Sequence, residues 1–350
     1  MNTIKKLTDY QVTIDHENKW ILLKITGGLL TYAIKNSLDT IDIQKSTILR
    51  FFSNYNHLFK EGWSFYILNY TEGHNLIKIS DNNKKYNLED VIKYFDYKIK
   101  IVSGNLIESK YNIPSLYFLS HSYFIQHKKR SYVDYDIKKR FIYLNRIPKI
   151  ARVYLFKEIM KHNILDNSFY SWNADNKEGF EGHEMVVGVK NKSIENFNYE
   201  PGDTYCEWAD LNEYYKHSFC TILTESEFDD DIIFITEKLL KSIINYHPFI
   251  SLSAPNYLKK LHELGFKTFD KWWDESYDTE IDLRKRILKI VDTLNYINNF
   301  SDEQIIKIKE EIKPIVLHNL NNLKKIEDKY PKYFEYKKLI HSFTKINHAI

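Results

Sequence analysis

Short apolar runs alternate with amphipathic segments along most of this chain. Runs rich in Ile, Leu, Phe and Tyr predict buried strands at 20–25, 63–70, 98–102, 115–119, 140–144, 219–223 and 249–252. Apolar positions at helical spacing predict helices at 43–59, 88–95, 151–161 and 256–264, after Thr236, and over most of the chain beyond 282. Strands that alternate with helices in this way indicate an α/β protein with parallel sheets.

A charged stretch at 127–139 interrupts this alternation and lacks periodic apolar positions. Such a stretch is typical of a linker, and 350 residues are enough for two domains of ordinary size. We therefore expect domains at 1–130 and 140–327, followed by a C-terminal helix at 328–350. We expect both domains to be α/β units of the same kind.

The segment around Thr236 joins an apolar run to an amphipathic helix. Thr236 is a favourable N-cap residue, and Glu237 and Lys238 follow it. A helix N-terminus that follows a strand is where α/β proteins bind phosphates, because its first backbone N–H groups are unpaired. Lysine would supply charge for phosphate, and glutamate would accept hydrogen bonds from ribose hydroxyls. The alternative is an ordinary capped helix whose charges are solvated.

Three more charged residues of the second domain fall near predicted strand ends. Arg146 lies in a strand-to-helix turn, Arg152 lies in the first turn of the next helix, and Glu225 follows the strand at 219–223. Guanidinium groups match diphosphate oxygens in a bidentate manner. Because carboxyl ends of parallel strands meet at one edge, these residues and the Thr236 turn are expected to converge on one crevice. Taken alone, either arginine is compatible with a solvated surface position.

Composition excludes several classes of protein. With 43% hydrophobic and 28% charged residues the chain is typical of globular proteins, and its net charge of +3 argues neither for nor against nucleic acid. Two cysteines, Cys206 and Cys220, cannot form a disulfide framework, so we expect reduced thiols in the cytoplasm. No apolar run approaches the roughly 18 residues that span a bilayer. The first residues lack the apolar segment of a signal peptide, and we expect neither a membrane span nor a Golgi-type anchor.

Two other clusters have ordinary explanations. The three adjacent aspartates at 229–231 cannot all face one ion, and the two cysteines lack the spacing of a zinc site, so we expect no metal site. Trp272 and Trp273 could stack on a sugar, but packing is the more common role of an aromatic pair.

The order of motifs in the second domain resembles the donor-binding region of the α-1,3-fucosyltransferase family. Tyr-Tyr-Lys-His-Ser-Phe-Cys-Thr-Ile-Leu-Thr-Glu at 214–225 is followed, at a similar spacing, by Phe-Ile-Thr-Glu-Lys at 234–238. The run at 247–278 also resembles glycosyltransferase-like proteins of phages and large viruses. Ser226 departs from the family, which has Asn after the glutamate, and the first domain contains no acceptor motif of the family. The resemblance covers 140–325.

This resemblance implies a GT-B fold, in which two Rossmann-like domains face a central cleft and a helical tail follows. It implies that a sugar is transferred from a nucleotide diphosphate sugar to a glycan or other hydroxyl acceptor, with inversion and without a metal. The GDP- or UDP-sugar donor would be a co-substrate, and no permanently bound cofactor is expected. The implied donor site consists of Arg146, Arg152, Glu225, Thr236, Glu237 and Lys238. Lys238 and one arginine would bind the diphosphate, and the two glutamates would lie near the ribose or the donor sugar.

Inverting transfer needs a general base that takes the proton of the acceptor hydroxyl. Glu72, just after the strand at 63–70, is the candidate. His74 is the alternative, because an imidazole ordinarily titrates nearer neutrality. Glu61 and Asp96 are weaker candidates.

Two alternative functions stay open. The acceptor could be a modified base of phage DNA, such as a hydroxymethylated one, because basic residues at 127–130 and 138–140 could follow phosphates. A viral enzyme would then act in the host cytoplasm. The other alternative is a non-catalytic nucleotide-binding or scaffold protein.

Overall fold

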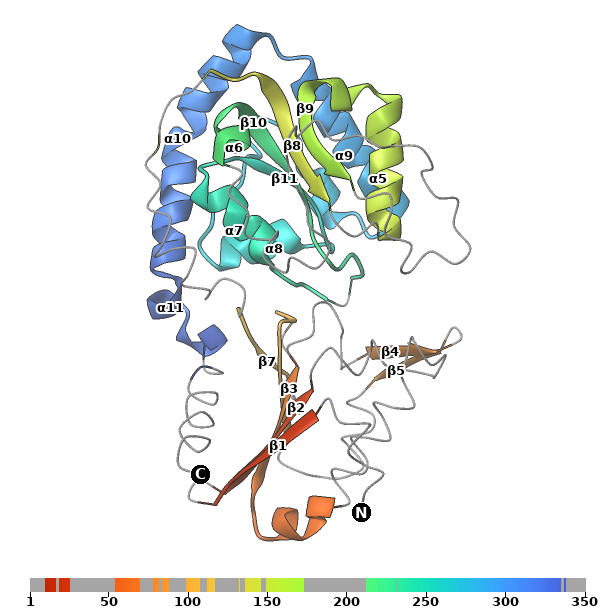
Figure 1. The fold of residues 1–350 in the computed structure, drawn as a ribbon, viewed down its shortest axis with the longest axis vertical. Helices are drawn as coiled ribbons and strands as arrows, with labels where there is room; N and C mark the ends of the chain where they lie inside the picture. Colours follow the sequence, from red (N-terminus) through yellow and green to blue (C-terminus); the bar gives the residue numbers. More distant parts are fainter. Residues whose placement is uncertain are drawn as a thin grey trace. The chain divides into compact units, whose positions relative to one another are not determined.

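The computed structural model of this chain (Figure 1) consists of two compact units, Met1–Tyr117 with Tyr330–Ile350, and Phe118–Lys329. Each unit contains a mainly parallel sheet, so the predicted α/β class is confirmed. The structure describes residues 10–16, 19–25, 54–69, 78–81, 84–87, 99–107, 112–116, 132, 136–145, 149–172, 212–230, 232–334 and 337. Within these ranges no helix is long and apolar enough to span a membrane.

The first unit contains a five-stranded sheet with the order β1-β2-β3-β6-β7. β1 is antiparallel to β2, and the other neighbours are parallel. Its strands are β1 (Tyr10–Asp15), β2 (Trp20–Ile25), β3 (Ser64–Asn69), β6 (Ile99–Ser103) and β7 (Asn112–Pro114), and a separate antiparallel pair is formed by β4 (Lys78–Asp81) and β5 (Lys84–Asn87). The described parallel strands follow one another in chain order, so this part of the sheet is wound in one direction.

The central strands of the first sheet form its core. Phe65 of β3 and Ile101 of β6 are completely buried, as is typical of parallel strands that are covered on both faces. Phe59, in the helical segment 54–60, stacks on Phe65. The chain leaves this helix through Gly62, whose φ of +83° is readily adopted only by glycine.

The second unit contains a four-stranded sheet with the order β11-β10-β8-β9, and all its neighbouring strands are parallel. The strands are β8 (Lys139–Asn145), β9 (Ser168–Trp172), β10 (Ser218–Thr224) and β11 (Phe249–Leu252). The helices are α5 (Ile150–Lys161), α6 (Asn212–Lys216), α7 (Glu237–Ile244), α8 (Tyr257–Glu263), α9 (Leu283–Asn298), α10 (Asp302–Lys324) and α11 (Ile326–Lys329), with short 3-10 turns at η4 (Ile164–Asn167) and η6 (Ser276–Thr279). A further 3-10 turn, η7 (Pro331–Phe334), belongs to the first unit.

The winding direction of the second sheet reverses between β8 and β10. From β8 the chain passes through α5 to β9 on one side, and it later returns to β10 on the other side of β8. Right-handed crossovers in opposite directions place their helices on opposite faces of a sheet. Accordingly, α5 contacts α9, whereas α7 contacts α10 (Figure 1). Open α/β sheets bind ligands at the carboxyl ends of the strands that flank such a reversal.

Most predicted elements within the described ranges are present. The strands predicted at 20–25 and 249–252 are β2 and β11, residue for residue. β1 was not predicted, because a single alternating segment at a sheet edge has a weak apolar signal. Of the strand predicted at 115–119, residues 117–119 lie outside the described residues; residues 115 and 116 follow the end of β7, where the Ser115 amide donates to the Ser103 carbonyl. The predicted helix at 88–95 lies outside the described residues.

A buried histidine joins the segment before β11 to the start of β10. His247 is 6% exposed, its Nε2 donates to the carbonyl of Tyr215 at 2.5 Å, and its Nδ1 accepts from the hydroxyl of Thr221 at 3.1 Å. A carbonyl oxygen can only accept, so Nε2 carries a proton, and in the neutral ring Nδ1 is the acceptor for the Thr221 hydroxyl. Burial lowers the pKa of His247 from 6.5 to about 4.

In the unfolded chain His247 binds a proton below pH 6.5, but in the folded chain it does so only at about pH 4. The free energy of unfolding is therefore expected to fall as the pH is lowered from 6.5 to about 4. The loss from this group amounts to about 3 kcal/mol. Urea unfolding of wild type and His247→Gln at pH 7 and pH 4.5 measures it. His247→Gln should be less stable at pH 7 and should show a smaller loss on acidification. The exposed control His162→Gln should keep the wild-type pH dependence, and a His247→Gln variant that does so as well would contradict the assignment.

Candidate functional site

The two strand ends at the winding reversal are tied together by a side-chain hydrogen bond. The hydroxyl of Thr224, the last residue of β10, donates to Oδ1 of Asn145, the last residue of β8, at 2.7 Å. Both side chains are buried, and Asn145 is 6% exposed. Nδ2 of Asn145 has no hydrogen-bond partner among the described residues. A donor is therefore held in a fixed orientation at the carboxyl edge of the sheet.

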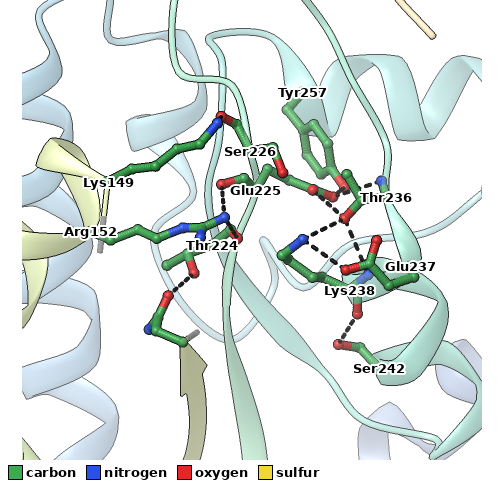
Figure 2. Close-up of polar contacts among 11 residues, drawn as sticks. Lys149, Arg152, Thr224, Glu225, Ser226, Thr236, Glu237, Lys238, Ser242 and Tyr257 are labelled. Atoms are coloured by element: carbon green, nitrogen blue, oxygen red, sulfur yellow. Dashed lines mark hydrogen bonds and ion pairs between the residues drawn. The ribbon is translucent and has the colours of Figure 1, made fainter. Parts of the chain in front are cut away.

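Two cations on the α5 side hold the chain that follows β10 (Figure 2). Nη2 of the buried Arg152 donates to the carbonyl oxygens of Thr224 and Glu225, at 3.2 and 2.8 Å. Lys149 precedes α5, and its Nζ donates to the carbonyl of Ser226 at 2.6 Å and lies 3.4 Å from Oε1 of Glu227. Positive charge is thus concentrated at the N-terminus of α5.

Glu225 is completely buried, and its carboxylate connects three segments of the second unit (Figure 2). Oε1 accepts from the Thr236 amide at 3.2 Å and from the Tyr257 hydroxyl at 2.7 Å, and Oε2 accepts from the Thr236 hydroxyl at 2.6 Å. Burial raises the pKa of Glu225, while the charge of Lys238 and the hydrogen bonds of Thr236 and Tyr257 oppose that rise. All three partners are donors, which is the arrangement that suits an ionised carboxylate.

The first turn of α7 combines a cap, an acid and a base. Thr236 is the N-cap, as predicted, and its Oγ1 accepts from the Lys238 amide at 3.2 Å. Nζ of Lys238 lies 3.3 Å from the same oxygen and 2.8 Å from Oε1 of Glu237. The side chain of Lys238 is 24% exposed, whereas that of Glu237 is only 6% exposed.

Glu237 carries a buried oxygen that the described part of the chain does not pair. Its Oε2 has no hydrogen-bond partner there, although Oε1 is bound by Lys238. Burial by itself raises the pKa of Glu237, but the charges of Lys238 and Lys241 outweigh it, and the net shift is downward. The group is therefore an ionised acceptor at a helix N-terminus.

The two helix N-termini at this edge differ in charge. α5 has no acidic residue in its first turn, its N-cap residue Lys149 makes no side-chain cap with the described residues, and Arg152 lies in its first turn. α7 is capped and begins with Glu237. Figure 2 shows Lys149 and Arg152 on one side of the chain at Glu225 and the first turn of α7 on the other. The α5 side favours anions, because the positive end of the helix dipole adds to two cations.

A buried arginine fixes the loops that follow β10 and β11. Arg286 of α9 is 2% exposed and donates to the carbonyl oxygens of Phe228, Ser253, Glu280 and Ile281. These carbonyls come from three segments: one after β10, one after β11 and the adjacent pair Glu280 and Ile281 before α9. The frame around the site is therefore held by buried charge as well as by apolar packing.

The predicted site residues fall into two groups. Those brought to the carboxyl edge of the second sheet are Arg152, Glu225, Thr236, Glu237 and Lys238. Those that lie outside the described residues are Arg146, Glu72 and His74. Their roles stay predictions.

Asn145, Lys149 and Tyr257 are at the site but were not predicted from the sequence. Asn145 could have been found only with the strand order, because its position matters through the reversal beside it. Lys149 has no distinguishing signal in a chain with 50 lysines and arginines. Tyr257 reaches Glu225 across 32 positions of sequence, a contact that periodicity does not encode.

The other candidate clusters have structural roles where they are described. Trp273 is buried beside Phe219 and Phe269, as the packing interpretation expects, whereas Trp272 is half-buried and its Nε1 donates to Oε2 of Glu311 at 2.7 Å. No group of three or more His, Cys, Asp or Glu residues in the described ranges could hold a metal ion. In the basic stretch at 138–140, Lys139 and Arg140 are the first residues of β8; Lys139 donates to the carbonyl of Asp166, and Arg140 pairs with Asp302 at 2.7 Å.

Comparison with known proteins gave no match: no family model fits this chain, and no curated protein sequence matches it.

Glu225→Gln tests the central carboxylate. An amide nitrogen would face a donor where Glu225 now accepts, and we expect the free energy of unfolding to fall by about 2–3 kcal/mol. Glu263→Gln, the same change at an exposed position of α8, should alter it by less than about 0.5 kcal/mol. Urea denaturation at pH 7 compares the two, and equal stabilities would contradict the described geometry.

Proposed function

We propose that this chain is a glycosyltransferase that binds a nucleotide diphosphate sugar at the carboxyl edge of the second sheet and transfers its sugar to a hydroxyl acceptor. The observation that carries the proposal is the first turn of α7. There a buried, ionised Glu237 has one oxygen that the described residues leave unpaired, and the partly exposed ammonium of Lys238 lies beside it. The pair stands next to the winding reversal, where α/β sheets bind nucleotides.

The chemistry of a nucleoside diphosphate agrees with this arrangement. Lys238 would neutralise phosphate charge, together with the uncapped N-terminus of α5 and its flanking Lys149. Glu237 would accept hydrogen bonds from ribose hydroxyls. When the sugar leaves, negative charge grows on the diphosphate, and cations that are already in place stabilise it in the transition state.

The proposal includes a GT-B arrangement, in which two Rossmann-like units share one cleft, and inverting transfer to a glycan or other hydroxyl. It is supported by two separate α/β units, of which the second has a reversed strand order. Glu72, or alternatively His74, would be the base. For the alternative of a DNA acceptor, the basic residues at 127–130 lie outside the described residues; Lys138 is exposed, and Lys139 and Arg140 are bound within the second unit.

Titration calorimetry with GDP, UDP and CDP tests the donor site, and slow hydrolysis of a panel of nucleotide sugars tests catalysis. Binding of one nucleotide with hydrolysis of its sugar conjugate is expected. Binding without hydrolysis or transfer would support the non-catalytic alternative. Absence of binding to all three nucleotides would refute the proposal.

Lys238→Ala removes the proposed phosphate cation. Affinity for the preferred nucleoside diphosphate should fall at least about tenfold, because one charge-assisted contact is lost. Lys259→Ala makes the same charge change at an exposed position of α8 and should leave the affinity unchanged. Calorimetry on both folded variants measures the difference, and equal affinities would reject the donor-site assignment.

Glu237→Gln tests the proposed ribose contact. Wild type should bind the ribonucleoside diphosphate about tenfold more tightly than its 2′,3′-dideoxy analogue, because the carboxylate accepts from the sugar hydroxyls. In Glu237→Gln this ratio should shrink to about threefold or less, because a neutral amide oxygen is a weaker acceptor. Competition binding gives the ratios directly, and an unchanged ratio would place the ribose elsewhere.

A further inference from the structure

Tyr257 is a buried residue whose side chain makes its one described hydrogen bond to the carboxylate at the centre of the site. It is the first residue of α8, it is completely buried, and its hydroxyl donates to Oε1 of Glu225 at 2.7 Å (Figure 2). Tyr257 does not touch Glu237 or Lys238 through any described hydrogen bond. The described hydrogen-bond route from Tyr257 to the proposed nucleotide site therefore passes through Glu225.

The hydrogen bonds between Tyr257 and Lys238 have a defined direction. The single hydroxyl proton of Thr236 is donated to Oε2 of Glu225 at 2.6 Å. Its oxygen can then only accept, and it receives the Lys238 amide at 3.2 Å and faces the Lys238 ammonium at 3.3 Å. Any change that rotates the Glu225 carboxylate also reorients the Thr236 hydroxyl, to which Lys238 donates.

We propose that Tyr257 is a positioning residue of the nucleotide site, and that it sets the orientation of the Lys238 ammonium through Glu225 and Thr236. The inference rests on the proposed function. Tyr257 and the Thr236 amide hold Oε1 of Glu225, and Oε2 receives the hydroxyl of Thr236. With both carboxylate oxygens fixed, the Thr236 oxygen faces Lys238, and together with Oε1 of Glu237 it holds the ammonium in place before a ligand arrives. Pre-ordering of this kind reduces the entropy lost on binding.

Tyr257→Phe removes the first bond of this chain and keeps the ring. The matched control is Tyr277→Phe, which deletes one equally buried hydroxyl from the same unit; that hydroxyl has no hydrogen-bond partner among the described residues. Titration with the preferred nucleoside diphosphate should show about a threefold to tenfold weaker affinity for Tyr257→Phe, and no change for Tyr277→Phe.

A double-mutant cycle with Lys238→Ala separates positioning from general destabilisation. If Tyr257 acts through Lys238, the double variant should bind no more weakly than Lys238→Ala alone. Additive losses, or equal losses in Tyr257→Phe and Tyr277→Phe, would overturn the inference while nucleotide binding by wild type still upheld the proposed function. Absence of wild-type binding would overturn both.

Backbone hydrogen exchange provides a check that needs no ligand. The Lys238 amide, which donates to Thr236, should exchange at least about fivefold faster in Tyr257→Phe than in Tyr277→Phe, because its acceptor is no longer fixed. Equal exchange rates in the two variants would show that Tyr257 does not reach this turn, and would overturn the inference independently of the nucleotide.

Discussion

The hydrogen bonds to the carboxylate of Glu225 are the interaction on which this edge of the second unit depends. It is completely buried, and removing a charge from water is costly unless hydrogen bonds replace the lost hydration. Thr236 and Tyr257 supply three such bonds, one each from an amide, an alcohol and a phenol. The end of β10, the start of α7 and the start of α8 are held together because each contributes to this one group.

Strand order then determines which charges meet at that edge. The reversal between β8 and β10 places α5 and α7 on opposite faces, so their N-termini approach the same strand ends from two sides. One N-terminus is uncapped and flanked by cations, and the other carries an ionised glutamate beside a lysine. A ligand with an anionic part and a hydroxyl-bearing part matches this division, as a nucleoside diphosphate does.

Several predicted ligand groups also act inside the protein. Arg152, one of the two arginines considered for the diphosphate, uses Nη2 to hold the carbonyls of Thr224 and Glu225 at the end of β10. Glu225, expected near a sugar, accepts from protein donors at both oxygens. Lys238 and Glu237 are the predicted residues whose described geometry leaves capacity for a ligand: Lys238 through its partial exposure, Glu237 through its unpaired oxygen. The polar residues Arg152 and Glu225 at this strand end thus act mainly in hydrogen bonds within the protein.

The sequence by itself determined the α/β class, most of the described elements and the capped start of α7, because apolar periodicity and capping are local properties. It also indicated that Arg152, Glu225 and the Thr236 turn belong to one edge, because each follows an apolar strand. Only the tertiary structure decided the strand order, and therefore the partnership of Asn145 with Thr224 and of Tyr257 with Glu225. These contacts join residues 79 and 32 positions apart, and their formation depends on how crossovers stack the strands, which local pattern does not specify.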